Sequence, residues 1–181
     1  MARKPVDQLQ RVFFALWPDA PVRAMLCELA REIARESGGR PTAPDLVHLT
    51  LAFLGEQPAV GVETLRCVGA GIRARAFTLT LDAVGCFPRA GIAWLGASAP
   101  QPDLTALQGS LAAALRVAGF AVAERPYAAH LTLARYSPVT VPHHLPRPVC
   151  WRVSSFVLVE SELGRGGSAY RIVAEWPLAT A

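Results

Sequence analysis

The stretch His48-Leu49-Thr50-Leu51 occurs a second time as His130-Leu131-Thr132-Leu133, so two of the four histidines share one sequence setting. In an extended strand, successive side chains point to opposite faces. Each stretch therefore predicts a strand with leucines on a buried face and a histidine and a threonine on the other face. If the two strands border one groove, two imidazole rings and two hydroxyl groups meet there.

A purely structural role would account for either stretch alone. Each could be a half-buried strand whose histidine is only hydrogen-bonded, because short motifs often arise by chance. The second copy, again in a sequence context typical of a strand, favours the functional interpretation.

Composition places the chain among ordinary globular proteins. It has 181 residues, of which 52% are hydrophobic and 18% charged, and this predicts a single domain over residues 1–181. The four cysteines are scattered without a Cys-x-x-Cys pair, as expected of core residues in a reducing compartment. No apolar run reaches the length of a signal peptide core or a membrane span. We therefore expect a cytoplasmic location and no membrane partner.

The charge favours an anionic partner, and the scarcity of lysines and the lack of one motif exclude two kinds of ATP-dependent chemistry. The net charge is +4 and the isoelectric point is near 9.2, and almost every positive charge is an arginine, which suits bidentate phosphate contacts. An arginine bias in the source proteome would give the same count. Lys4 is the only lysine, whereas an ATP-dependent nucleotidyl ligase needs a lysine nucleophile. A Gly-x-x-x-x-Gly-Lys loop is also absent, which excludes P-loop ATP chemistry.

Periodicity predicts an α+β fold. Helical spacing of apolar residues indicates helices over 19–37, 59–75 and 102–119. Alternation and β-branched content indicate strands over 11–17, 46–54, 77–82, 91–96, 128–136, 152–162 and 169–176. A proline-spaced loop over 138–148 is expected to hold His143 and His144 in solvent. Each repeated motif lies in a strand that follows a helix, which predicts two pseudo-symmetric lobes of mainly antiparallel sheet with helices outside and a groove between them.

On these motifs the chain resembles the two-histidine (2H) phosphoesterases. More narrowly, it is similar to the bacterial RNA 2′,3′-cyclic phosphodiesterases, also called 2′-5′ RNA ligase-like proteins. The likeness covers nearly the whole chain, through residues 11–15, 49–55, 94–96, 125–127 and 176–178. Two departures are Ala129, where relatives commonly carry proline, and Tyr127, where phenylalanine is usual. The resemblance implies that His48 donates a proton and His130 accepts one, on RNA or a nucleotide with a 2′,3′-cyclic phosphate.

The chemistry of the four motif side chains agrees with that implication. Opening a cyclic phosphodiester requires a base that takes a proton from water and an acid that protonates the departing ribose oxygen. Histidine can do either task near neutral pH. The hydroxyl groups of Thr50 and Thr132 can donate hydrogen bonds to the phosphate oxygens on which charge builds in the transition state. The two identical tetrapeptides do not by themselves say which histidine is the acid.

Two further residues are candidates for binding the substrate. Arg135 stands where relatives carry an arginine that contacts phosphate, but simple alternation places it on the leucine face. It reaches the groove only if the strand bulges or ends first. Phe14 is a candidate for stacking on a base, as aromatic side chains do in proteins that bind single strands. Packing in the core is the commoner role of such a residue.

Other functions are less well supported by the sequence. A metal site on His48 and His130 would lack further ligands, since no His-x-x-x-His or cysteine cluster accompanies them. No Gly-x-Ser-x-Gly elbow indicates a serine hydrolase. We therefore predict a monomeric, metal-independent hydrolase that yields 2′-phosphates and needs no cofactor or protein partner, with reversible 2′-5′ joining left open. The alternative is a non-catalytic binder of RNA ends or nucleotides, although a binder has no need of an acid and a base.

Overall fold

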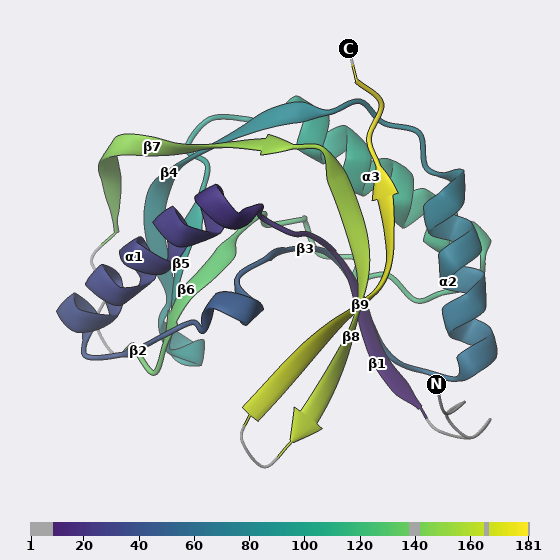
Figure 1. Ribbon diagram of the computed structural model, residues 1–181, viewed down its shortest axis with the longest axis horizontal. Helices are drawn as coiled ribbons and strands as arrows, with labels where there is room; N and C mark the ends of the chain where they lie inside the picture. Colours follow the sequence, from purple (N-terminus) through teal and green to yellow (C-terminus); the bar gives the residue numbers. More distant parts are fainter. Residues whose placement is uncertain (1–8, 138–141, 165–166, 181) are drawn as a thin grey trace.

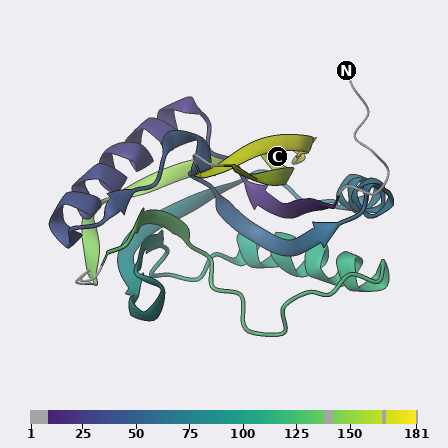
Figure 2. The same ribbon diagram turned by 90° about the horizontal axis from the view of Figure 1, so that it is seen from below.

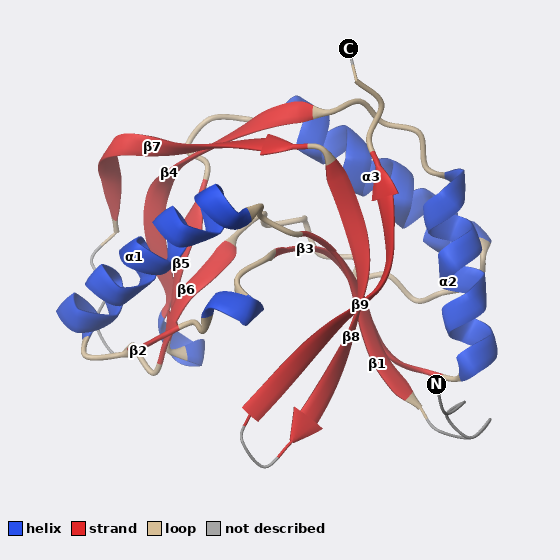
Figure 3. Ribbon diagram, viewed as in Figure 1, coloured by secondary structure: helices blue, strands red, loops and turns tan. Residues whose placement is uncertain are grey.

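The computed structural model describes residues 9–137, 142–164 and 167–180, which form a mixed arrangement of helices and antiparallel strands (Figure 1, Figure 3). In chain order the elements are β1 (Gln10–Leu16), α1 (Ala20–Ser37), β2 (Arg40–Pro41), η1 (Pro44–Leu46), β3 (Leu49–Gln57), α2 (Ala59–Gly71), β4 (Phe77–Phe87), η2 (Pro88–Ala90), β5 (Ile92–Gly96), α3 (Pro102–Val117), β6 (Leu131–Arg135), β7 (His143–Val153), β8 (Ser155–Gly164) and β9 (Gly167–Pro177). The predicted α+β class is confirmed.

The strands of the described residues join in one nine-stranded sheet. Its order is β7-β4-β5-β6-β3-β1-β8-β9, and the short strand β2 pairs with β6 outside this path. The two halves, β6-β5-β4-β7 and β3-β1-β8-β9, are therefore joined in one sheet where β3 meets β6. These two are the motif strands, so the repeated sequence lies at the centre of the sheet, where the halves meet.

Helix α1 follows its sequence signals closely. The side chain of Asp19 accepts a hydrogen bond from the backbone N–H of Val22 at 3.0 Å, and Gly38 ends the helix with a left-handed φ of 70°. Such a cap satisfies N–H groups that have no partner within the helix. In Figure 1, α1 lies beside β6, while α2 and α3 lie together at the opposite end of the molecule, and Figure 2 shows the same separation. None of the described helices is long and apolar enough to span a membrane.

The leucines of both motifs are buried as the alternation predicts. Leu49, Leu131 and Leu133 are fully buried and Leu51 is 2% exposed. They belong to one hydrophobic core that also takes in buried leucines of all three helices. A smaller cluster of Phe13, Ala15, Val157 and Val159 forms separately from this core.

Element boundaries differ from the sequence prediction at several turns. The first motif strand begins at Leu49 and not at 46, because residues Pro44–Leu46 form a 3₁₀ turn. Helix α2 ends at Gly71, four residues before the predicted end. The second motif strand is also shorter, from Leu131 to Arg135. Each histidine therefore stands immediately before its strand.

The predicted proline-rich loop is wrong for residues 143–148. These residues begin strand β7, and His143 and His144 lie opposite Val84 and Ala83 of β4. Proline removes a donor from a strand and is confined to sheet edges or bulges. β7 is the edge strand of its half, which explains how Pro146 fits there. Residues 138–141 of the predicted loop lie outside the described residues.

Candidate functional site

The two motifs lie side by side in the structure. Leu49 of β3 pairs with Leu131 of β6 in antiparallel register. In an antiparallel pair the residues on either side of such a match also lie opposite each other. Thr50 is thus placed across from His130 and His48 across from Thr132, so that the polar groups of both motifs meet on the sheet face opposite the buried leucines.

Both histidines are oriented by the same local hydrogen bond. Nδ1 of His48 lies 2.7 Å from the carbonyl oxygen of Leu46, and Nδ1 of His130 lies 2.8 Å from that of Ala128. A carbonyl oxygen can only accept, so Nδ1 carries the hydrogen in both rings. This leaves Nε2 as the nitrogen that gains or loses a proton. The hydroxyl of Thr50 lies 3.1 Å from Nε2 of His48.

A tyrosine hydrogen bond links the two motif regions. The hydroxyl of Tyr127, three residues before His130, donates to the carbonyl oxygen of Thr50 at 2.8 Å. Burial raises the pKa of the Tyr127 phenol, so the hydroxyl stays protonated and available as a donor. This bond adds to the short pairing between β3 and β6, and a phenylalanine at position 127 would lack it. Ala129 does not prevent His130 from reaching the site.

His48 is enclosed by aromatic rings. The ring centre of Phe13 lies 4.9 Å away, Trp17 stacks at 5.7 Å, and Tyr170 meets the imidazole edge-on at 5.3 Å. Burial lowers the pKa of His48 below its ordinary value of 6.5, and the positive charges of Arg135 and His130 lower it further. The carbonyl of Leu46 opposes these effects. In the free protein the imidazole therefore gives up its proton readily.

Among the described residues, His130 has fewer aromatic neighbours than His48. Its ring meets Phe87 edge-on at 5.0 Å, and Phe87 in turn packs against Trp94 at 5.7 Å. The imidazole is half-buried. The two identical tetrapeptides thus place their histidines in different surroundings.

Arg135 faces the site because β6 contains a bulge. Ala93 pairs with Ala134 and the next residue, Trp94, pairs with Thr132, so Leu133 is left without a partner on β5. A bulge shifts the alternation by one residue. Both Leu133 and Ala134 are buried, Arg135 is exposed, and its charge acts on His48. The condition under which Arg135 reaches the groove is therefore met.

The first motif strand has the same irregularity. Phe14 and Ala15 of β1 pair with Ala52 and Thr50, which leaves Leu51 as the extra residue of β3. The sequence repeat in fact includes one more letter, Ala52 and Ala134, and each bulge lies at the Leu-Ala step.

Phe53 therefore corresponds to Arg135, the next residue in each copy. The Phe53 ring is 51% exposed, and the guanidinium carbon of Arg11 lies 4.9 Å from the centre of its ring. Sequence reasoning missed this pair, although alignment of the two repeats beyond the fourth letter could have found Phe53.

The prediction that Phe14 stacks on a base is wrong. Its side chain is fully buried and packs against Phe156 at 6.2 Å and Trp176 at 5.8 Å. Its neighbour Phe13 points the other way and contacts His48. A run of aromatic residues at the end of β1 does not reveal which member faces the core, and for the same reason Trp17 was missed.

Two other features bear on the choice of chemistry. Within the described ranges, no group of three or more His, Cys, Asp or Glu side chains is arranged to hold a metal ion. His143 and His144 lie on β7, at the far edge of the half that contains β6, and so are not brought to the two motifs.

Comparison with known proteins assigns the family. Residues 17–165 match the 2′-5′ RNA ligase superfamily. The chain is 35% identical to the RNA 2′,3′-cyclic phosphodiesterase of Escherichia coli (strain K12), over 96% of this chain and 99% of that one, and 30% identical to the enzyme of the same name from Thermus thermophilus, over 93% and 90%. The crystal structure of E. coli LigT complexed with 3′-AMP superposes with a TM-score of 0.85 at 34% identity, over 94% of this chain and 99% of that one. The chain therefore belongs to the 2′-5′ RNA ligase superfamily.

Proposed function

We propose that the protein hydrolyses RNA 2′,3′-cyclic phosphate ends to 2′-phosphates without a metal ion. The observation that carries this proposal is the pairing of the two motifs. It brings the two histidines together beside two threonine hydroxyls. Each imidazole is held at Nδ1 by a local backbone carbonyl, and Nε2 is left to exchange protons. Two relatives that align over nearly their full length are named RNA 2′,3′-cyclic phosphodiesterase.

The proposed reaction is a single displacement at phosphorus. Nε2 of His130 takes a proton from water, the water oxygen bonds to phosphorus, and the bond from phosphorus to the 3′ oxygen breaks. Nε2 of His48 gives its proton to that oxygen, which leaves as the 3′-hydroxyl. These roles follow the resemblance to the 2H phosphoesterases. Thr50 and Thr132 donate to the non-bridging oxygens, where preorganised donors stabilise the transition state.

The environment of His48 suits a general acid whose imidazole becomes protonated when the substrate binds. Burial and the charge of Arg135 lower its pKa in the free protein, which favours the neutral ring. An anionic phosphodiester in the groove supplies an opposite charge and so favours the protonated ring. Arg135 interacts with the same phosphate, and its influence on His48 is partly offset when the substrate binds.

The exposed Phe53 gives a surface for a base at the other end of the groove. Phe53 corresponds in the repeat to Arg135, so it flanks His130 as Arg135 flanks His48. Stacking on an aromatic ring stabilises a base by about 1–3 kcal/mol. The guanidinium of Arg11 lies over one face of the Phe53 ring, so a base would stack on the other face. We assign to Phe53 the stacking role that Phe14 cannot have.

We further propose that the enzyme acts as a monomer in the cytoplasm, without a cofactor or a protein partner. In the same displacement a 5′-hydroxyl can take the place of water: its oxygen bonds to the phosphorus of the 2′,3′-cyclic phosphate, the bond to the 3′ oxygen breaks, and a 2′-5′ link forms. The reverse of this step cleaves the link and re-forms the cyclic phosphate. The paired acid and base serve both directions.

The decisive experiment uses a short RNA that ends in a 2′,3′-cyclic phosphate. The purified protein is incubated with it in EDTA, and ³¹P NMR identifies the product. We expect a 2′-phosphate, and no product from His48→Ala or His130→Ala. Loss of turnover in EDTA that zinc or manganese restores would refute metal independence. Binding of the RNA without turnover would instead favour the non-catalytic binder.

A further inference from the structure

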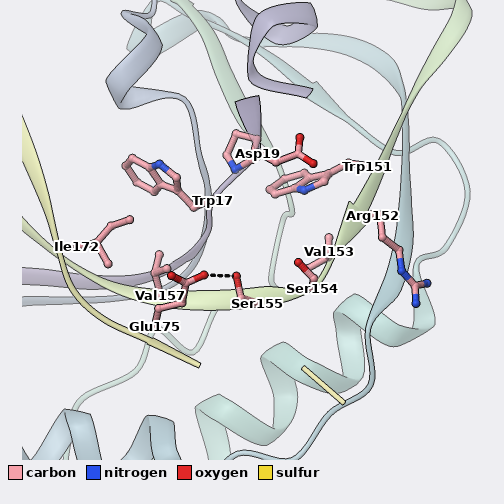
Figure 4. Close-up of a pocket in the computed structure, with 11 residues that line it drawn as sticks. Trp17, Asp19, Trp151, Arg152, Val153, Ser154, Ser155, Val157, Ile172 and Glu175 are labelled. Atoms are coloured by element: carbon pink, nitrogen blue, oxygen red, sulfur yellow. Dashed lines mark hydrogen bonds between the residues drawn. The ribbon is translucent and has the colours of Figure 1, made fainter. Parts of the chain in front are cut away.

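A pocket of about 240 Å³ opens beside Trp17 (Figure 4). Trp17 is one of the three aromatic residues that enclose His48, so the pocket lies next to that histidine's surroundings. Trp17 and Trp151 lie along one side of it, and Ser155 and Glu175 face them from the strands β8 and β9. Sites for whole small-molecule ligands begin at roughly 300 Å³. This volume therefore suits one planar ring system and not an entire nucleotide.

The pocket lies on the same face of the sheet as the motif threonines. Thr50 pairs with Ala15, Ala15 with Val157, and Val157 with Glu175. Residues directly opposite each other on neighbouring strands share a face, so Glu175 lies on the face of Thr50, about 14 Å away across three strand spacings. Trp17 stacks on His48 and also lines the pocket. The pocket is thus a continuation of the groove.

The charged groups of the pocket disfavour a phosphate. Asp19 and Glu175 bring two carboxylates to its lining, whereas the guanidinium of Arg152 points away from the space between Trp17 and Glu175 (Figure 4). Asp19 is occupied in capping α1 through Val22. Glu175 accepts a hydrogen bond from the Ser155 hydroxyl at 2.6 Å, which orients its carboxylate. An aromatic ring beside an oriented acceptor is suited to a base with N–H donors on its edge.

Guanine has the edge that best fits such a carboxylate. Its ring N1–H and its 2-amino group are adjacent donors, and a carboxylate offers two acceptor oxygens at matching spacing. Uracil presents one N–H between two carbonyl oxygens, and adenine and cytosine each place a ring acceptor beside the amino group. In these three bases the carboxylate would meet an acceptor as well as a donor. Bidentate recognition of this kind discriminates between bases by about 1–3 kcal/mol in protein–DNA complexes.

We propose that this pocket binds the guanine base of the nucleotide that precedes the cyclic phosphate end, and that Glu175 determines this preference. The assignment rests on the proposed function, which places the reacting phosphate between His48 and His130. Glu175 is farther from the reacting phosphate than a base is from the phosphate on its own ribose. The base of the neighbouring nucleotide can reach it. The pocket makes the enzyme selective for the RNA sequence just before the end.

The test compares three dinucleotides, GpA, ApA and UpA, each ending in a 2′,3′-cyclic phosphate, with adenosine 2′,3′-cyclic phosphate alone. We expect kcat/KM for GpA to exceed that for ApA and UpA by about 10-fold or more. Glu175→Gln should abolish this advantage and leave the mononucleotide unchanged, because glutamine offers one acceptor in place of two. Glu32→Gln, an exposed position on α1, is the matched control and should retain the advantage.

A binding measurement separates this inference from the proposed function. Isothermal titration with GpA and ApA carrying a 2′-phosphate reports the base preference without turnover. Equal affinities, or a preference that Glu175→Gln leaves intact, would overturn the guanine pocket even if every cyclic phosphate is hydrolysed. A guanine preference in binding with no hydrolysis of any substrate would support the pocket and overturn the proposed hydrolase.

Discussion

The two copies of the repeat share the residues His-Leu-Thr-Leu-Ala, one histidine hydrogen bond and one bulge, yet their surroundings differ. His48 is enclosed by three aromatic rings and lies within the electrostatic reach of Arg135. His130 is flanked among the described residues by one aromatic ring, that of Phe87. Local sequence thus makes the two imidazoles geometrically equivalent, and only their tertiary neighbours give them different chemistry. Each prediction below perturbs one side of this comparison.

The largest effect is expected from the histidines themselves. His48→Ala and His130→Ala should each lower kcat/KM by at least about 10²-fold, the usual minimum contribution of a positioned proton transfer. A substrate with sulfur in place of the 3′ oxygen leaves as a thiolate and hardly needs an acid. It should therefore restore much of the activity of His48→Ala and little of that of His130→Ala. Restoration of only the second variant would reverse the assignment of the two roles.

The next largest loss of activity is expected from substitution of the two motif threonines. Thr50→Ala and Thr132→Ala should each reduce kcat by about 10- to 10³-fold, the range around the loss of one transition-state donor. Neither change should unfold the protein, because both side chains lie on the groove face. Leu49→Ala and Leu131→Ala are the contrasting variants, and removal of either buried side chain should cost about 2–5 kcal/mol of stability in urea unfolding. Stable leucine variants and unfolded threonine variants would contradict the assignment of the two faces.

Removal of the hydrogen bond between Tyr127 and Thr50 should have a smaller effect on stability and activity. Tyr127→Phe removes one hydrogen bond to the carbonyl of Thr50, which should lower the free energy of unfolding by about 0.5–1.5 kcal/mol. The kcat should fall less than in either threonine variant, since the donors remain but their spacing is less well held. Tyr136→Phe, at a 73% exposed tyrosine, is the control. An equal loss of stability and kcat in the two variants would show that the hydrogen bond from Tyr127 to Thr50 has no special role.

The charge of Arg135 should be visible as a shift in the titration of His48. Removal of that charge in Arg135→Gln takes away one of the causes that lower the pKa of His48, so the pKa should rise toward 6.5. NMR titration of the imidazole C–H signals measures it, with Arg31→Gln on the exposed face of α1 as the control. An unchanged His48 titration would mean that Arg135 does not act on the ring.

The smallest effect concerns stability and pH. Because the pKa of His48 lies below 6.5 in the folded protein, the unfolded chain binds more protons than the folded one when the pH falls below about 6.5. The free energy of unfolding should therefore decrease as the pH drops through this range. His48→Gln should flatten the decrease, whereas His144→Gln on β7 should not. A wild-type stability that rises in this window would contradict the enclosed setting of His48.

The repeat by itself predicted the two central strands of this protein and which of their side chains face the core. Alternation along residues 48–51 and 130–133 predicts which side chains are buried and which are polar, because strand periodicity is a local property of the backbone. Helix α1 was predicted equally well, since the spacing of Val22, Leu26 and Ile33 and the cap at Asp19 depend only on nearby residues.

The tertiary structure decided what depends on distant partners. The bulge that turns Arg135 toward His48 arises from the pairing of β6 with β5, and whether Phe13 or Phe14 meets the site depends on which face of β1 the core covers. The prolines of β7 fit a strand because that strand lies at the edge of the sheet. The pocket at Trp17 also forms between residues far apart in the chain. Such features depend on strand order and register, which no single stretch of sequence specifies.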